Sequence, residues 1–274
     1  MSQGNHGWSR MWCISHQQHG CFTHRVPTLS RPSSSTYRFN SLSNVLSIMA
    51  SLRIREQDLT DKVAVITGAS RGIGRAIALN LASRGCSILG TCVTTESIAL
   101  INSMNEEIDT NFRSSSRTHN VKILGISCSI LSPTCAQTIV DTLVENFSSR
   151  VDIFINNASD ARDAALGELS VESIQESMIS NIQTPVLIVE EFVKRKMFQP
   201  ESRIIYISSV RSRQPWSGQL MYAAGKSAGE SLCRTWSMAF GGKEEKVNKQ
   251  FLSAHFTSKT LIFIFSCFSS AIHG

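Results

Sequence analysis

The sequence predicts an α/β fold in which a doubly wound parallel sheet carries helices on both faces. Three observations lead to this class. Short apolar runs rich in β-branched residues alternate with segments of helical period. A glycine-rich turn joins the first such run to the first helical segment, and further polar motifs follow the ends of predicted strands. In open sheets of this kind, ligands bind beyond the carboxyl ends of the strands.

Each element follows from its own pattern. The predicted strands are the apolar runs at residues 63–67, 87–93, 121–127, 151–155 and 203–207. Amphipathic spacing predicts helices at residues 73–84, 98–108, 134–147, 171–197 (as one helix or two) and 222–240. The first helix is expected to stop at Gly85, and the polar stretch 109–120 is expected to be a loop.

The N-terminal segment differs from this body in charge. The first 55 residues contain six arginines and no acidic residue, so the chain from Glu56 onward has 21 basic and 21 acidic residues. We therefore expect residues 1–58 to be a separate basic, Ser/Arg-rich extension. Its composition is typical of a mitochondrial transit peptide. The alternatives are a disordered extension, or upstream sequence with Met49 as the true initiator. A cytoplasmic or mitochondrial location follows.

The neutral body argues against nucleic-acid binding, because it lacks the basic stripe that contacts phosphate backbones. The eight cysteines form no CxxC pair and no Cys/His cluster at zinc spacing, so we expect reduced thiols, no disulfide framework and no metal site. Cys128, for example, follows an apolar run and is expected to pack as a small hydrophobe.

The glycine-rich turn carries the first chemical motif. Its residues 67–74, TGASRGIG, follow the first strand and open the first helix. Glycines allow backbone N–H groups to approach a pyrophosphate, and the helix N-terminus favours negative charge. The alternative is an ordinary tight turn between strand and helix. The strand-before, helix-after context favours phosphate binding by residues of this turn: Gly68, Ser70, Arg71, Gly72, Ile73 and Gly74.

Tyr222 and Lys226 form the second motif, at the start of the last helix. Residues four apart share one helix face, so the ammonium group is expected to lie near the phenol. A nearby positive charge favours the phenolate and lowers the pKa of a tyrosine toward neutrality. This suits a general acid that works near pH 7. The spacing alone is also common on solvated helix faces.

Taken together, the motifs resemble those of the classical short-chain dehydrogenases/reductases, a family with a Rossmann-like fold. The glycine turn, Asn156-Asn157-Ala158, Ser208-Ser209 and the Tyr222/Lys226 pair occur in the family's order. Ser209 lies 13 residues before Tyr222, and Asn181 lies 28 residues before Ser209, as in that family. The resemblance is closest to the 3-oxoacyl-(acyl carrier protein) reductase type, including the segment 89–95.

The resemblance implies roles for individual residues. Tyr222 would donate a proton to a carbonyl as hydride arrives from nicotinamide, or abstract it in the reverse direction. Lys226 would lower the tyrosine pKa and bind the nicotinamide ribose. Ser209 would hold the substrate oxygen, and Asn181 would hold a water in the proton relay. Asn156 and Ala158 would line the cofactor groove, and Ser129 stands where an aspartate usually contacts the adenine.

The end of the second strand bears on cofactor choice. NAD enzymes place an acid there to bind the ribose 2′-hydroxyl, and that acid would repel a 2′-phosphate. Here the strand ends in a hydroxyl-bearing Thr94, the first acid is Glu96, and Arg71 offers a cation. We therefore expect NADP(H), with NAD(H) as the alternative if Glu96 turns inward.

The C-terminal segment 247–274 departs from the family's pattern. The predicted domain, residues 59–246, ends where the composition changes at Val247, and we expect the sheet to lack its last one or two strands. Translated intron or frameshifted sequence would explain the change. The apolar run 261–265 is too short to span a bilayer, which needs ~20 apolar residues. It is either a buried strand or part of a tail without evolved structure.

The sequence bears on three candidate functions. The first is an NADP(H)-dependent oxidoreductase that reduces a 3-oxoacyl-type or other ketone, or runs the reverse reaction. The second is a truncated, inactive nucleotide-binding or scaffold protein. The third, a sugar-nucleotide epimerase, is disfavoured because such relatives carry GxxGxxG in the first turn. The expected partner is a small carbonyl or alcohol substrate, with Pro215 and Trp216 bordering its pocket. Neither a membrane nor nucleic acid is expected, and the family favours a homodimer or homotetramer.

Overall fold

The computed structural model describes residues 57–112, 121–214, 216–240, 252–257 and 260–264. Every described residue belongs to one compact unit of the chain, which lies within residues 50–274. The predicted extension 1–58 therefore lies almost wholly outside the described residues, and so do Pro215 and most of the tail after residue 240.

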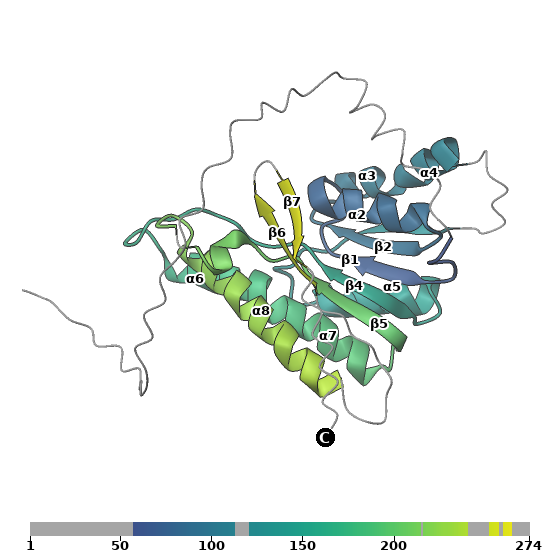
Figure 1. Ribbon diagram of the computed structural model, residues 1–274. Helices are drawn as coiled ribbons and strands as arrows, with labels where there is room; N and C mark the ends of the chain where they lie inside the picture. Colours follow the sequence, from purple (N-terminus) through teal and green to yellow (C-terminus); the bar gives the residue numbers. More distant parts are fainter. Residues whose placement is uncertain (1–56, 113–120, 215, 241–251, 258–259, 265–274) are drawn as a thin grey trace, which may run out of the picture. The chain divides into compact units, whose positions relative to one another are not determined.

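A single sheet forms the centre of this unit (Figure 1). Its strand order is β3-β2-β1-β4-β5-β6-β7, and the pairs from β3 to β6 are all parallel. The five predicted strands are β1 (Val63–Ile66), β2 (Ser87–Cys92), β3 (Ile123–Ser127), β4 (Val151–Asn156) and β5 (Phe198–Tyr206). The order reverses between β1 and β4, and such a reversal opens a ligand crevice at the carboxyl ends of those two strands.

The sheet continues beyond β5, which corrects the expectation that its last strands are missing. β6 (Leu252–Thr257) runs parallel to β5, with Ile205 opposite Leu252. β7 (Thr260–Ile264) is antiparallel to β6, so the apolar run is a strand. Only two residues connect β6 to β7, and a connection this short can join only antiparallel strands. These two residues are not an Asn-Gly or similar pair, which is the usual sequence signal of a hairpin turn.

Helices cover both faces of the sheet (Figure 1). On one face lie α2 (Gly72–Ser83), α3 (Ile98–Asn102) and α4 (Met104–Phe112), which pack against one hydrophobic cluster. On the other lie α5 (Cys135–Asn146), α7 (Thr184–Lys194) and α8 (Leu220–Phe240), which pack against a second cluster. Shorter pieces among the described residues include η1 (Thr95–Ser97), α6 (Val171–Met178) and η3 (Val210–Ser212). The doubly wound class is thus confirmed.

Element boundaries depart most clearly from the sequence prediction at residues 98–112 and at β5, which begins at Phe198 rather than at residue 203, whereas the segment 171–197 was predicted as one helix or two. The helix predicted at 98–108 is two helices, which meet at Ser103. The second of them reaches Phe112, so residues 109–112 are helical rather than loop. The long segment 171–197 resolves into two helices, α6 and α7, joined by the π-helical turn η2 (Ile179–Gln183).

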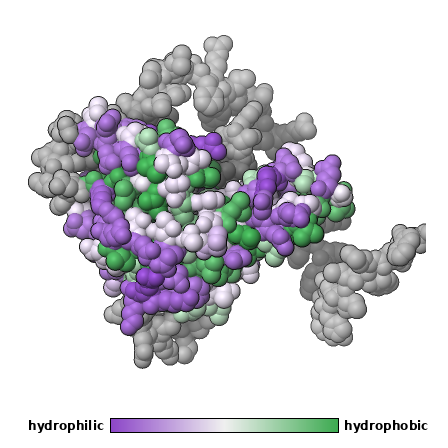
Figure 2. Space-filling view, turned by 180° about the vertical axis from the view of Figure 1, so that it is seen from behind, coloured by the Kyte–Doolittle hydropathy of each residue, from purple (hydrophilic) through white to green (hydrophobic). Residues whose placement is uncertain are grey.

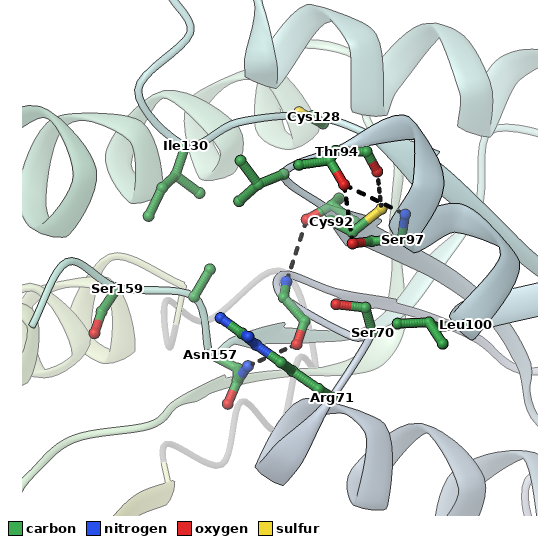
Figure 3. A pocket seen from close by; sticks show the side chains of 14 residues that line it. Ser70, Arg71, Cys92, Thr94, Ser97, Leu100, Cys128, Ile130, Asn157 and Ser159 are labelled. Atoms are coloured by element: carbon green, nitrogen blue, oxygen red, sulfur yellow. Dashed lines mark hydrogen bonds between the residues drawn. The ribbon is translucent and has the colours of Figure 1, made fainter.

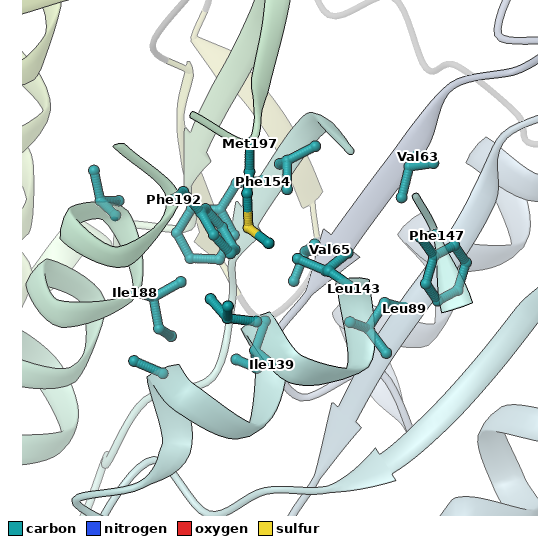
Figure 4. Close-up of a cluster of buried hydrophobic side chains, with 14 of the residues drawn as sticks. Val63, Val65, Leu89, Ile139, Leu143, Phe147, Phe154, Ile188, Phe192 and Met197 are labelled. Carbon is teal, nitrogen blue, oxygen red and sulfur yellow. The ribbon is translucent and has the colours of Figure 1, made fainter. Parts of the chain in front are cut away.

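The alternation of side chains along the strands divides the core between the two faces of the sheet, and Figure 4 shows the cluster on one of them. In β1, Val63 and Val65 belong to the cluster under α5 and α7, whereas Ala64 and Ile66 belong to the cluster under α2. This follows from the two-residue period of a strand. All four are buried, which explains why the run is continuously apolar. Among the described residues, no helix is long and apolar enough to cross a membrane.

Candidate active site

The turn after β1 depends on its glycines. Gly68 and Gly72 have φ angles of 69° and 58°, in the left-handed region that glycine adopts without strain. A Cβ on Gly74 would lie 2.2 Å from the carbonyl oxygen of Gly68, so the start of α2 can approach the turn only through a glycine. No side chain caps the first N–H groups of α2, which leaves these donors for an anion.

Asn157 fixes this turn to the end of β4. Its Nδ2 donates to the carbonyl oxygens of Thr67 (2.9 Å) and Gly68 (3.2 Å). In return, Oγ1 of Thr67 accepts from the backbone N–H groups of Asn157 and Ala158, both at 3.0 Å. These bonds cross the point where the strand order reverses. They hold the glycine turn open as a preformed cradle.

A pocket of about 620 Å³ lies beside this turn (Figure 3). Its walls come from the glycine turn, the end of β2 with η1, the loop after β3, and the loop after β4. The lining residues are Gly68, Ser70, Arg71, Thr91, Cys92, Val93, Thr94, Ser97, Leu100, Cys128, Ile130, Asn157, Ala158 and Ser159. No acidic residue is among them. The size is that of a site for a small organic ligand.

The charge of the pocket comes from Arg71. Its side chain is exposed and makes no ion pair with any residue in the described ranges. Thr94 accepts from the backbone N–H of Ser97 at 3.4 Å and thereby caps η1 at the pocket's edge. The carboxylate of Glu96 accepts from its own backbone N–H and from the Thr94 hydroxyl, which lower its pKa. Glu96 does not line the pocket.

The predicted cofactor residues fall into three groups. Five line the pocket: Gly68, Ser70, Arg71, Thr94 and Ala158. Three form the adjoining turn and the start of α2 without lining it: Gly72, Ile73 and Gly74. The remainder lie elsewhere: Asn156, Ser129, Tyr222 and Lys226.

Asn156 and Ser129 are displaced from the pocket for local reasons. Asn156 is the last residue of β4 and is buried, 5% exposed, whereas its neighbour Asn157 faces the pocket. Oγ of Ser129 accepts from the backbone N–H of Leu131 at 3.2 Å, which turns that side chain into its own loop. The residues on either side of Ser129 contribute to the lining instead.

Lys226 and Tyr222 lie on α8, as their spacing predicted. Lys226 is 2% exposed, and its Nζ lies 5.5 Å from the centroid of the Tyr222 ring. The same ammonium group donates to the carbonyl oxygen of Ile207, at the end of β5, over 2.6 Å. Burial lowers the pKa of Lys226 to about 8. The half-buried Tyr222 forms no hydrogen bond through its hydroxyl with any described residue, so this group is available to a ligand.

The two serines after β5 are oriented differently. Ser208 donates to the Glu230 carboxylate over 2.6 Å, which directs its hydroxyl to the interior. Oγ of Ser209 accepts from the backbone N–H of Arg211 at 3.2 Å, and its hydroxyl proton makes no hydrogen bond to any described residue. Of the two, Ser209 therefore has a free donor. This is the serine favoured by the sequence spacing.

Asn181 connects the π-helical turn to α8 and to the loop after β4. Its Oδ1 accepts from the backbone N–H of Asp160 (2.8 Å), and its Nδ2 donates to the carbonyl oxygen of Asp160 (2.9 Å) and to Oγ of Ser177 (3.2 Å). A Cβ on Gly225 would lie 2.7 Å from Cβ of Asn181, so α8 packs closely on this turn. Turns of this type often occur at functional sites.

Comparison with known proteins assigns the family. The family model described as short chain dehydrogenase matches residues 62–253. The chain belongs to the short-chain dehydrogenase family. Its fold also matches crystal structures of a blue fluorescent protein from a metagenomic library in complex with NADPH (27% identity, TM-score 0.59) and of a short chain dehydrogenase from Burkholderia cenocepacia in complex with NADP (26% identity, TM-score 0.58). Each match covers 67% of this chain and 70% of the other.

Among curated relatives, an L-xylulose reductase from Aspergillus niger is 33% identical over 196 residues, and a 3-oxoacyl-[acyl-carrier-protein] reductase from Escherichia coli is 31% identical over 166 residues. The matches cover 66% and 61% of this chain. The chain spans less than two thirds of these short-chain dehydrogenases, 63% and 62% of their lengths.

Sequence reasoning missed several pocket-lining residues of this short-chain dehydrogenase, among them Asn157, and also Glu230 outside the pocket. Asn157 was quoted in a motif but given no role, although strand alternation turns it away from Asn156. Glu230 accepts hydrogen bonds from Ser208 (2.6 Å), Ser212 (2.7 Å) and Arg213 (3.2 Å), and so ties the segment around Ser209 to α8. Its position on the same helix face as Lys226, four residues on, could have identified it.

Proposed function

We propose that this short-chain dehydrogenase is an NADP(H)-dependent oxidoreductase that reduces a ketone to an alcohol, with Tyr222 as the general acid. The observation that carries the proposal is the buried ammonium group of Lys226 beside the Tyr222 ring. A positive charge in a low-dielectric surrounding stabilises a phenolate far more than it would in water. Lys226 thereby lowers the cost of proton transfer from Tyr222 to a carbonyl oxygen.

The pocket beside the glycine turn supports NADP(H) as the cofactor. Bound there, the reduced dinucleotide supplies the hydride. The uncapped N–H groups of α2 and the cradle that Asn157 holds open suit a pyrophosphate. Arg71 suits a ribose 2′-phosphate, because a guanidinium binds phosphate with paired, charge-assisted hydrogen bonds. No acid lines the pocket to repel that phosphate. NAD(H) is the less favoured alternative.

Ser209 and Asn181 take supporting roles in the proposal. The free hydroxyl proton of Ser209 can hold the substrate's carbonyl oxygen in place for Tyr222. Both N–H groups of the Asn181 side chain are engaged by Asp160 and Ser177, whereas Oδ1 accepts one hydrogen bond and can accept a second from a water. This residue would therefore act through its position against α8 and through that water. Binding the substrate oxygen between two positioned donors accounts for much of the rate enhancement in such sites.

The substrate is proposed only as a ketone. The relatives include reductases of a sugar ketone and of 3-oxoacyl thioesters, so both classes belong in a test. Trp216, 58% exposed and stacked under the guanidinium of Arg211 at 4.0 Å, is available to contact the substrate.

A homodimer or homotetramer is part of the same proposal. Exposed apolar side chains on α6 and α7 could be covered by a second copy: Val171, Met178, Leu187 and Val193. Hydrophobic patches also interrupt the polar surface in the view of Figure 2. Light scattering coupled to size-exclusion chromatography would measure the mass, and a monomer at micromolar concentration would contradict this part.

Two measurements on the full-length protein test the function. Fluorescence titration gives the dissociation constants of NADPH and NADH, and we expect NADPH to bind at least tenfold more tightly. Steady-state NADPH oxidation is then followed with ketoses, 3-oxoacyl thioesters and simple aromatic ketones. Turnover of one class supports the proposal. Tight NADPH binding without turnover of any ketone would favour the second candidate, an inactive nucleotide-binding protein.

A further inference from the structure

Two cysteines meet in the wall of the cofactor pocket. Cys128 follows β3, and Cys135 is the first residue of α5. Their sulfur atoms are 2.6 Å apart, although the two residues are seven positions apart in the chain. A disulfide joins its sulfurs at ~2.05 Å, so the two need to move only about 0.6 Å closer. Both thiols are free in this structure.

The loop between the two cysteines is held in place on either side of them. The backbone N–H of Cys128 donates to the carbonyl oxygen of Cys92 over 2.7 Å, and that of Cys135 donates to the carbonyl oxygen of Ser132 over 3.1 Å. Thr184 of α7 donates to the carbonyl oxygen of Ile130 over 2.6 Å. Because these bonds fix the loop, the sulfurs stay adjacent in the reduced protein.

The pair also shares a proton in a way that favours oxidation. The thiol of Cys128 donates to the sulfur of Cys135, which raises the pKa of Cys128 and lowers that of Cys135. The lowered pKa makes Cys135 the more readily ionised thiol of the pair, which suits it to attack an oxidised Cys128. Thiolates are the reactive form of cysteine.

Access to the pair is through the pocket. Cys128 is 6% exposed and lines the pocket, whereas Cys135 lies behind it and is 1% exposed. Cys92 lines the same pocket, but its thiol donates to the carbonyl oxygens of Thr94 and Ile126. Cys86 and Cys233 are buried away from it, and burial raises the pKa of each to about 12. Cys92, Cys86 and Cys233 therefore serve as internal controls against which oxidation of the pair is compared.

We propose that Cys128 and Cys135 are a site of reversible oxidation, at which a peroxide that enters the empty cofactor pocket forms an intramolecular disulfide. The sulfur of Cys128 attacks one oxygen of the peroxide and becomes a sulfenic acid as the O–O bond breaks, and its proton passes to the released hydroxide, which leaves as water. The sulfur of Cys135 then attacks that sulfenic acid, loses its proton and expels water. In total, two thiols lose two protons and two electrons, and one H₂O₂ becomes two waters.

Bound cofactor covers the wall that contains Cys128, so it should slow this oxidation. This part of the inference rests on the proposed function, whereas formation of the disulfide does not. The test treats the full-length reduced protein with a small excess of H₂O₂. Peptide mass spectrometry then maps disulfides, with and without saturating NADP. We expect a Cys128–Cys135 disulfide that dithiothreitol reverses, and at least tenfold slower formation when NADP is bound.

Matched variants separate this pair from its neighbours. In Cys135→Ala, Cys128 should stop at the sulfenic acid, which dimedone traps. Cys233→Ala, outside the pocket, should still form the disulfide at the wild-type rate, and Cys86 and Cys92 should remain reduced. A Cys92–Cys128 disulfide, or no disulfide between Cys128 and Cys135, would overturn the proposal. If the disulfide forms equally fast with and without NADP, the inference that bound cofactor blocks access to Cys128 is wrong. A lack of NADP binding in the titration itself would instead count against the proposed function.

Discussion

The buried charge of Lys226 should make the stability of this protein depend on pH in a defined direction. Burial lowers the pKa of this lysine from 10.5 to about 8 in the folded chain. The unfolded chain therefore binds one more proton than the folded chain between these two pH values, and stability from this group rises as the pH increases through that window. Below about pH 8 the full cost of burying the ammonium group is present, roughly 3 kcal/mol.

The comparison of the wild type with Lys226→Met isolates this effect. Methionine keeps the length of the side chain and removes both the titrating group and its hydrogen bond to Ile207. Buried groups with raised pKa, such as Cys86, Cys233 and Tyr206, act in the opposite sense but equally in both proteins. The wild type should therefore gain about 2 kcal/mol relative to the variant between pH 7 and pH 9.5.

Urea unfolding followed by circular dichroism measures the two free energies of unfolding at each pH. Equal slopes of free energy against urea concentration would show that the variant changes stability alone. A difference between wild type and variant that stays constant from pH 7 to pH 9.5 would refute the reasoning, because it would mean that Lys226 titrates alike in the folded and unfolded chains.

Three further substitutions test the site. Arg71→Ala should raise KM for NADPH by ~10–100-fold, because it removes a charge-assisted hydrogen bond to the 2′-phosphate, and should leave KM for NADH within twofold. Equal effects on both cofactors would show that Arg71 does not bind the 2′-phosphate. Gly74→Ala places a Cβ 2.2 Å from the Gly68 oxygen, so urea unfolding should show a loss of about 1–3 kcal/mol, whereas an unchanged or higher stability would contradict the close approach. Glu230→Ala should lower kcat about tenfold, because the segment around Ser209 loses its hydrogen bonds to α8, and should leave the affinity for NADPH unchanged. A normal kcat would show that Glu230 does not position Ser209 for the reaction.

The central fold was predictable because its strands are buried on both faces. A run such as 63–66 is apolar at every position, and only a sheet covered by helices on both sides buries all four residues. The glycine turn was equally clear, since Gly68 and Gly74 meet a geometric demand that no other residue satisfies. These features act within a few residues, so a local pattern reveals them.

The last two strands were not predictable in the same way. β6 pairs with β5 through the register of Ile205 and Leu252, which is a contact between distant segments. The hairpin between β6 and β7 lacks the turn residues that mark such connections. The sequence prediction therefore allowed a strand at residues 261–265 but expected the sheet to end early.

Details of the site depended on side-chain direction. The doublet Asn156-Asn157 offers two candidates, and only the backbone path at the end of β4 decides that Asn157 supports the turn. The cysteine pair shows the same limit. Cys128 and Cys135 have no recognisable motif, because the contact arises from the loop that brings the start of α5 back to β3.

The central claim is that Tyr222 transfers the proton in an NADPH-dependent reduction. The most direct measurement is the single-turnover rate of NADPH oxidation by Tyr222→Phe with the best ketone of the panel. The exposed Ser237→Ala on the same helix serves as the control. We expect the rate of Tyr222→Phe to fall ~10²–10⁴-fold with unchanged NADPH affinity, and the control to match the wild type. Wild-type turnover by Tyr222→Phe would contradict the account.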